Sequence, residues 1–344
     1  LNFCSNDYLS LAAHPRVVEA LRAGAARYGA GSGASALVCG RSAAHEELEA
    51  LLADWLGRER ALLFGSGYLA NLSIAVTFGG GRSGLIAEDR NNHASLVDGA
   101  LLSRARLKRY RHADPRSLEQ ALAGGPEHKL VLTDGVFSMD GDRAPARDLA
   151  RVCGAAEALL VVDDAHGIGV LGEGGRGLLE EARLGAIDVP LLVGTFGKAL
   201  GTAGAFVAGP APLIETLVQK ARTYIYSTAP PPALAVATTE ALRVVRDDHE
   251  RRARLRRNVG HFRSRAATLG IDFAGSTTPI QPLIVGSAEA ALRGSARLLE
   301  AGILVTAIRP PTVPRGTSRL RITLCADHEE HEIDRLVETL AALR

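Results

Sequence analysis

Three short segments of the sequence combine residue types that could act on a small molecule. The first is an apolar run, Leu159–Val162, that leads directly into Asp163, Asp164 and His166. Ligands of open α/β sheets bind at the carboxyl ends of the strands, where two acids and a histidine could hold a metal ion or act as an acid–base pair. A helix cap or a solvated turn would explain the same residues without any function. The buried strand that precedes them favours a functional site.

The second segment places a lysine among small residues. Lys198 follows the apolar run Leu191–Thr195 and has glycines at positions 194, 197 and 201. A poorly solvated lysine loses its proton more readily, as the formation of a Schiff base requires. Arginine stays protonated in proteins, so the amine must come from one of the four lysines. The other three have the charged or helical surroundings of surface residues: Lys108, Lys129 and Lys220.

The third segment, Phe64–Asn71, contains a glycine-rich turn between a predicted strand and a predicted helix. Backbone N–H groups at such a helix start bind phosphate, although many strand–helix turns use glycine for steric reasons only. Taken together, the three segments supply what pyridoxal phosphate needs. The lysine bonds the aldehyde, the aspartate keeps the pyridine nitrogen protonated, and the turn holds the phosphate.

These segments lie within an alternation of short apolar runs and helical stretches. Most of the runs are continuous, which predicts strands buried on both faces of a mostly parallel sheet. From residue 130 to residue 191 they recur about every 30 residues, the size of a βαβ unit. Glycines at 29 and 57 end two predicted helices, and residues 29–40 are predicted as a loop. The predicted strands are Ala61–Phe64, Leu85–Ala87, Leu130–Thr133, Leu159–Asp163, Leu191–Thr195 and Ala205–Ala208.

A different pattern follows the three prolines at 230–232. A long charged helix is predicted over 233–269, then strands over 282–285, 303–308 and 319–324, and a last helix over 328–343. The sequence therefore predicts an N-terminal segment (1–45), a large pyridoxal-phosphate-binding domain (46–235) and a small C-terminal α+β domain (236–344). The arginine-rich stretches 104–111 and 251–257 are predicted to be solvated faces.

Composition excludes several classes of protein. The 344 residues are 47% hydrophobic, which is ample for a buried core, and the net charge of +2 gives no global field for nucleic acid or for a membrane surface. No apolar run approaches the roughly 20 residues that span a bilayer. The four cysteines form no CxxC pair, so we expect buried reduced thiols, no metal site and a cytoplasmic protein.

Further motifs extend over most of the chain. They resemble those of the α-oxoamine synthases, a family of pyridoxal-phosphate enzymes, and the resemblance runs from residue 1 to about residue 328. It implies the aspartate-aminotransferase-like α/β fold: a large domain with a mostly parallel sheet flanked by helices, and a smaller C-terminal α+β domain. It also implies a homodimer with active sites at the interface. The motifs are Ser5–Leu9, Asn92–Ser95, Gly135–Gly141, Asp163–Gly167 and Thr195–Lys198.

Two stretches, Asp163–Gly167 and Ala307–Pro314, are most similar to the branch of this family that serves biotin biosynthesis. This resemblance implies a decarboxylating acyltransferase that condenses L-alanine with a pimeloyl thioester, on coenzyme A or an acyl carrier protein, to 8-amino-7-oxononanoate. An α-oxoamine synthase that uses glycine or serine and another acyl-CoA is the alternative. A non-catalytic protein on this fold also stays open. A nicotinamide-dependent dehydrogenase is disfavoured because no GxGxxG opens a helix after a strand.

The resemblance further implies a role for each matching residue. Lys198 would bond the cofactor and move the substrate's α-proton, Asp163 would pair with the pyridinium and His166 would contact the ring hydroxyl. His93 would stack on the ring and touch the acyl substrate. The other cofactor contacts would be Gly67, Tyr68, Ser138, Thr195 and Thr228, with Arg309 on the substrate carboxylate and Thr312 on the acyl group.

Structural alternatives accompany several of these assignments. His93 could cap a helix, Ser138 could close a turn, and Arg309 could be a solvated arginine. The chain departs from the family pattern at Ser10 and at Asp134, where glycine and glutamate are common, and neither is expected to touch a catalytic group.

Overall fold

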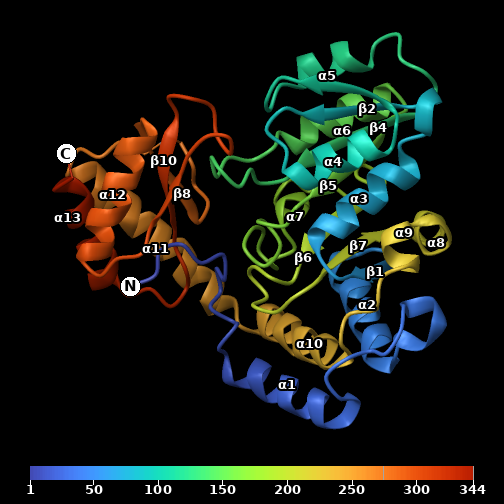
Figure 1. Ribbon diagram of the computed structural model, residues 1–344, viewed down its shortest axis with the longest axis horizontal. Helices are drawn as coiled ribbons and strands as arrows, with labels where there is room; N and C mark the ends of the chain where they lie inside the picture. Colours follow the sequence, from blue (N-terminus) through green and yellow to red (C-terminus); the bar gives the residue numbers. More distant parts are fainter. Residues whose placement is uncertain (274, 344) are drawn as a thin grey trace. The chain divides into compact units, whose positions relative to one another are not determined.

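The computed structural model describes residues 1–273 and 275–343. The chain divides into two compact units, each described here by itself (Figure 1). The larger unit consists of Leu11–Phe137 and Arg143–Asp247, and the smaller one of Leu1–Ser10, Ser138–Asp142 and Asp248–Arg344. The domain boundaries at residues 45 and 235 stay predictions.

A seven-stranded sheet with the order β1-β7-β6-β5-β4-β2-β3 forms the centre of the larger unit. Only β7 runs against its neighbours, β1 and β6, and the other adjacent pairs are parallel. The prediction of a mostly parallel sheet is thus confirmed. The strands are β1 (Arg60–Phe64), β2 (Leu85–Asp89), β3 (Arg106–Tyr110), β4 (Lys129–Asp134), β5 (Leu159–Asp163), β6 (Leu191–Thr195) and β7 (Ala205–Gly209).

Helices contact this sheet along its whole width (Figure 1). Apolar residues of α3, α4, α8 and α9 pack with alternate strand residues such as Leu62, Leu132 and Val193 in one buried cluster. The helix α2 contacts β1 and β7, and α5 and α6 contact β2, β3 and β5. The helices are α1 (Pro15–Tyr28), α2 (Ala43–Leu56), α3 (Gly67–Phe78), α4 (Ala94–Leu102), α5 (Pro115–Leu122), α6 (Ala146–Ala155), α7 (Leu178–Glu181), α8 (Ala211–Lys220), α9 (Arg222–Ile225) and α10 (Pro232–Asp247).

The four arginines of the basic stretch 104–111 are exposed, as predicted for a solvated face, but the stretch also contains a strand that was not predicted. The basic stretch 104–111 contains the edge strand β3, where the Tyr110 ring is 1% exposed and the side chain of Arg109 forms an ion pair with Glu88 of β2 at 3.2 Å. An edge strand tolerates long basic side chains because they can extend into water. Within the predicted loop 29–40, residues Ala36–Gly40 form a π-helical turn.

The predicted helix over 233–269 is in fact two helices, α10 and α11 (His249–Thr268). Asp248 lies between them, and its carboxylate accepts the Arg251 N–H at 3.1 Å, which caps the start of α11. One arginine of the stretch predicted to be a solvated face, Arg252, is only 1% exposed.

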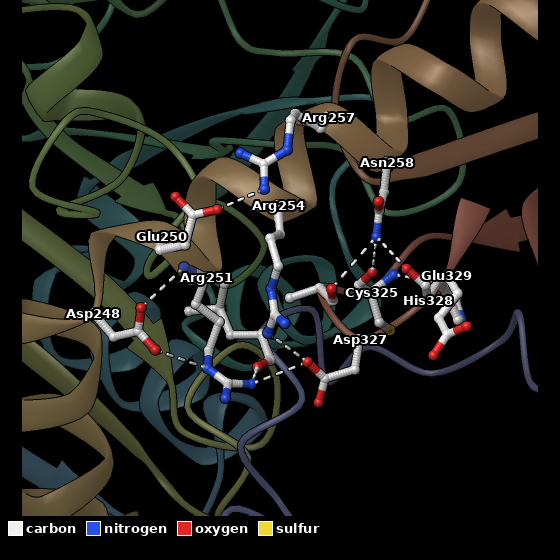
Figure 2. Close-up of polar contacts among 12 residues, drawn as sticks. Asp248, Glu250, Arg251, Arg254, Arg257, Asn258, Cys325, Asp327, His328 and Glu329 are labelled. Atoms are coloured by element: carbon white, nitrogen blue, oxygen red, sulfur yellow. Dashed lines mark hydrogen bonds and ion pairs between the residues drawn. The ribbon is translucent and has the colours of Figure 1, made fainter.

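The smaller unit contains an antiparallel sheet of order β8-β10-β9. Its strands are β8 (Ile280–Gly286), β9 (Thr306–Ile308) and β10 (Ser318–Thr323), and α12 (Ala288–Glu300) contacts all three. The last helix, α13 (Glu330–Ala341), packs on α11. A network of polar contacts joins the start of α11 to the turn at 325–328 (Figure 2). There the amide of Asn258 donates to the carbonyls of Cys325 and His328, both at 2.9 Å.

The cysteine environments differ from the expectation of buried thiols. Cys153 and Cys325 are buried, whereas Cys39 is exposed and Cys4 is partly exposed. Over 1–273 and 275–343, none of the helices combines the length and the apolar composition needed to cross a bilayer.

Candidate functional site

The carboxyl ends of three neighbouring strands bring the predicted site residues of the larger unit together. Asp163 ends β5 and lies directly beside Asp134, which ends β4, in the register of the sheet. Lys198 follows β6, the neighbour of β5 on the other side. His166, 8% exposed, lies in the turn after β5. This arrangement is the edge of the sheet at which ligands of α/β proteins bind.

The loop that carries Lys198 is closed by backbone hydrogen bonds. The N–H of Phe196 donates to the Gly204 carbonyl and the N–H of Gly201 to the Lys198 carbonyl, both at 2.9 Å. Gly201 has a φ of +65°, and a Cβ there would collide with the backbone of residues 11 and 12. The loop therefore fixes the backbone of Lys198, whose side chain is half-buried.

The two adjacent aspartates of the sequence motif have different surroundings. The Asp163 carboxylate accepts the Ala165 N–H at 3.0 Å and is 7% exposed. Asp164 is fully buried, accepts the Leu178 N–H at 2.6 Å, and is closely surrounded by glycines at 135, 167 and 177. Burial raises the pKa of Asp164 to about 8. Asp164 is therefore a buried packing residue beneath the turn that follows β5.

His93 is the N-cap residue of α4, and hydrogen bonds to polar neighbours hold it in position. Its backbone N–H donates to the Asp134 carboxylate at 2.8 Å, and its ring Nδ1 accepts the Ser95 N–H at 3.3 Å and lies 2.8 Å from Ser95 Oγ. Partial desolvation lowers the pKa of His93; the negative charge of Asp163 opposes this shift and the positive charge of Lys198 adds to it. The His93 ring therefore caps α4, which is the structural alternative given for this residue in the sequence analysis. The expectation that Asp134 touches no candidate catalytic group is wrong, because Asp134 holds the backbone of His93.

Asp134 is itself an unusual acid. It is 5% exposed, and burial together with the negative charge of Asp163 raises its pKa well above the ordinary value, while the charge of Lys198 opposes the shift. The positive charge of Lys198 therefore influences His93, Asp134 and Asp164. These electrostatic effects place the amine close to the strand ends.

Asn71 is a buried residue of the site that the sequence analysis did not identify. Its amide nitrogen donates to Asp163 at 2.6 Å and to Ser95 Oγ at 2.8 Å, and the residue is 1% exposed. The signal in the sequence is weak: an amide side chain one turn inside a mostly apolar helix, α3.

The glycine-rich turn forms the predicted helix start. Ser66 caps α3 by accepting the Leu69 N–H at 3.3 Å, and the first N–H groups of a helix have no partner within it. Thr195 lies beside this turn, since a Cβ at Gly67 would meet only the Thr195 Cβ, at 4.0 Å. The open space next to backbone donors suits a phosphate group. Tyr68 is 41% exposed, and its hydroxyl donates to Asp98.

Thr228 is exposed and pairs with Ser35 in an isolated β-bridge. It lines a pocket together with Gly65 of the glycine-rich turn and with His45 of α2. The structure thus brings Thr228 near the turn.

Three predicted site residues lie in the smaller unit. The Ser138 carbonyl accepts a hydrogen bond from Arg321 at 2.6 Å, and Arg309 and Thr312 lie in an exposed turn in which the Thr312 N–H donates to the Arg309 carbonyl at 3.0 Å. The buried arginines 319 and 321 of β10 were not identified from the sequence. They are 4% and 8% exposed.

The donor set of the larger unit fits pyridoxal phosphate. A buried carboxylate, an amine on a fixed loop and a helix start with room for a phosphate are the three groups that this cofactor requires. These three groups would hold the cofactor without a metal ion.

Comparisons with known proteins agree with this geometry. Residues 1–340 match the family model described as aminotransferase class I and II. The chain is 61% identical to 8-amino-7-oxononanoate synthase of Methylococcus capsulatus, over 99% of this chain and 88% of the relative, and 58% identical to that of Thioalkalivibrio sulfidiphilus, over 98% and 86%. Among solved structures it is similar to serine palmitoyltransferase from S. paucimobilis (TM-score 0.96, 30% identity, 100% of this chain and 87% of that one). It is also similar to 8-amino-7-oxononanoate synthase from Francisella tularensis (TM-score 0.87, 30% identity, 99% and 97%).

Proposed function

Since this chain belongs to the aminotransferase class I and II family, we propose that it is a pyridoxal-phosphate-dependent acyltransferase of biotin biosynthesis. It condenses L-alanine with a pimeloyl thioester to 8-amino-7-oxononanoate and releases CO2 and a free thiol. The observation that carries this proposal is the identity of 54–61% to synthases of that name, over nearly the full chain.

The site residues support the reaction class. Pyridoxal phosphate, when bound, supplies a carbonyl carbon that bonds an amine and a ring that withdraws electrons from the neighbouring Cα bonds. Asp163 would hold a proton on the ring nitrogen, and His166 would contact the ring hydroxyl. The N–H groups of Gly67 and Tyr68, with Thr195, would hold the phosphate.

The proton transfers are assigned to Lys198. Its Nζ would take the proton from Cα of alanine and later return a proton to the product carbon. The His93 ring would pack against the cofactor and donate a hydrogen bond to the thioester oxygen as negative charge develops there.

The remaining assignments rest on the family resemblance. Ser138 would contact the cofactor, Arg309 would bind the alanine carboxylate through a bidentate contact, and Thr312 would contact the acyl chain. We also propose a cytoplasmic homodimer in which Thr228 contributes to the partner's phosphate site. Sedimentation of the purified protein tests the dimer.

Serine palmitoyltransferase is the competing model because its fold matches this chain closely, yet its identity is only 30%. A turnover panel separates the two functions. Alanine, glycine and serine are each combined with pimeloyl, acetyl and palmitoyl thioesters of coenzyme A, and thiol release is followed. The fastest turnover is expected for alanine with the pimeloyl thioester. Faster turnover with glycine or serine would overturn the assignment of alanine.

A further inference from the structure

Four polar groups of the larger unit form a continuous series of hydrogen bonds; three of them are buried, and the fourth, His93, is exposed. One end is the Asp163 carboxylate, which accepts from the Asn71 amide at 2.6 Å. The same amide nitrogen lies 2.8 Å from Ser95 Oγ, and Ser95 Oγ lies 2.8 Å from the His93 Nδ1. Asn71 and Ser95 are 1% and 0% exposed, so water does not compete for the two bonds that the Asn71 amide donates.

The Asp163 carboxylate sets the direction of the hydrogen bonds that the Asn71 amide makes. An ionised carboxylate can only accept, so it must face the NH2 end of Asn71, and a flipped amide would place two acceptors 2.6 Å apart. The second hydrogen of that NH2 group is then donated to Ser95 Oγ. The Ser95 hydroxyl then has its own hydrogen left to donate to His93 Nδ1.

The backbone supports the same direction at His93. The Ser95 N–H, which can only donate, points at Nδ1 from 3.3 Å. Partial desolvation lowers the pKa of His93 despite the opposing charge of Asp163, which favours the neutral ring near neutral pH. A neutral ring whose Nδ1 accepts hydrogen bonds carries its hydrogen on Nε2.

We propose that Asn71 and Ser95 are positioning residues that couple the Asp163 carboxylate to the tautomer of His93. They hold Asp163 in place for the ring nitrogen of the cofactor and keep His93 as the Nε2–H tautomer. Nε2 then has a hydrogen to donate to the oxygen of the acyl substrate. The inference rests on the proposed roles of Asp163 and His93 and assigns the residues that support both.

The Asn71 side chain shows features of a group placed for these two partners. Among the residues that the structure describes, its Oδ1 atom is buried without a hydrogen-bond partner. If the Asn71 side chain served only for packing, we would expect both ends of its amide to be hydrogen-bonded, or an apolar residue in its place. Here the nitrogen end is fully used and the oxygen end is not.

The test is nitrogen NMR of the holoenzyme labelled with 15N-histidine, in which two-bond couplings identify the tautomer and His93→Gln assigns the signal. The first variant, Ser95→Ala, removes the hydroxyl donor from a helical position that accepts alanine. We expect the Nδ1–H tautomer of His93 to rise about threefold to tenfold, in proportion to a lost neutral hydrogen bond, and the Kd of the cofactor to change by less than about threefold.

The second variant, Asn71→Asp, is isosteric and replaces the donor with an acceptor. The introduced carboxylate would take the hydrogen of the Ser95 hydroxyl away from His93 and would repel Asp163. The same shift of tautomer is expected, together with a cofactor Kd raised about tenfold or more, as for a lost hydrogen bond to a charged group.

The matched control is Asn258→Ala in the smaller unit, a buried asparagine whose amide donates only to backbone carbonyls in Figure 2. It should lower thermal stability but change neither the tautomer nor the cofactor Kd. A single Nε2–H tautomer in Ser95→Ala, or equal effects of Asn71→Asp and Asn258→Ala, would overturn the proposal. These readouts do not depend on which amino acid or thioester is turned over, so a failed turnover panel leaves them interpretable.

Discussion

The half-buried amine of Lys198 should be the only lysine whose loss removes the covalent cofactor bond. We expect Lys198→Ala to lose the visible absorbance band of a pyridoxal group bonded to lysine, and borohydride to add no cofactor mass to this variant. Lys220→Ala is the matched control, because Lys220 is an exposed lysine at the end of α8. Absorbance spectra and intact mass measure both. A band that survives in Lys198→Ala would show that another amine bonds the cofactor.

Asp164 gives the larger unit a distinctive dependence on pH. Burial raises its pKa from an ordinary 3.8 to about 8, so the folded protein keeps a proton that the unfolded chain releases. The stability gained from this proton is fully present below about pH 4 and is lost as the pH rises to about 8. The slope is at most about 1.4 kcal/mol per pH unit.

The isosteric Asp164→Asn cannot ionise and should lack this slope. Denaturant unfolding of both proteins from pH 5 to pH 8.5 measures it. The variant is expected to gain stability relative to the wild type as the pH rises. A difference between the two proteins that stays constant over this range would contradict the raised pKa.

The contact between α3 and α4 determines whether Asn71 can reach Ser95. Gly99 of α4 lies against α3, where a Cβ would be 2.9 Å from the Ala75 Cβ and 3.2 Å from the Asn71 carbonyl oxygen. Gly99→Ala must push the helices apart, at a cost of about 1–3 kcal/mol in the free energy of unfolding. The cofactor Kd should rise as well. Gly154→Ala in α6, where a Cβ would meet open space, is the control: it should not lower the free energy of unfolding, because alanine favours a helix more than glycine does, and it should leave the cofactor Kd unchanged.

The parts of the fold that were predicted correctly are those that local sequence determines. The strands β5 and β6 were predicted with their observed ends because each is a continuous apolar run that stops at polar residues. The strand β3 was missed because its charges suit an edge strand only in the context of the sheet, where Arg109 meets Glu88. Asn71 was missed for a similar reason. Its partners come from α4 and β5, and no spacing in the sequence shows that these elements meet.

The smaller unit is built from three separate stretches of the chain. The two short stretches, residues 1–10 and 138–142, are bound to the long one by hydrogen bonds. The first, residues 1–10, contributes the N–H of Phe3 to the Leu304 carbonyl at 3.0 Å and accepts the Thr323 N–H at 2.8 Å. The second, residues 138–142, is held by Arg319, which donates to the Met139 carbonyl at 3.1 Å, and by Ser276, which donates to the Gly141 carbonyl at 3.0 Å. The two short stretches therefore belong to the smaller unit although they are far from residue 248 in the sequence.

Because the smaller unit is assembled from all three stretches, we predict that residues 248–344 do not fold alone. Phe3 is fully buried, so its absence would leave a cavity in the core and would expose backbone partners on both sides of it. We expect a poorly dispersed amide NMR spectrum for 248–344. A chain that joins 1–10 to 248–344 through a glycine–serine linker should give more dispersed signals and a cooperative melting transition. Phe3→Ala in the joined chain should reverse most of this gain, at a cost of about 3–5 kcal/mol. A well-dispersed spectrum for 248–344 by itself would show that the C-terminal stretch folds without the N-terminal segment.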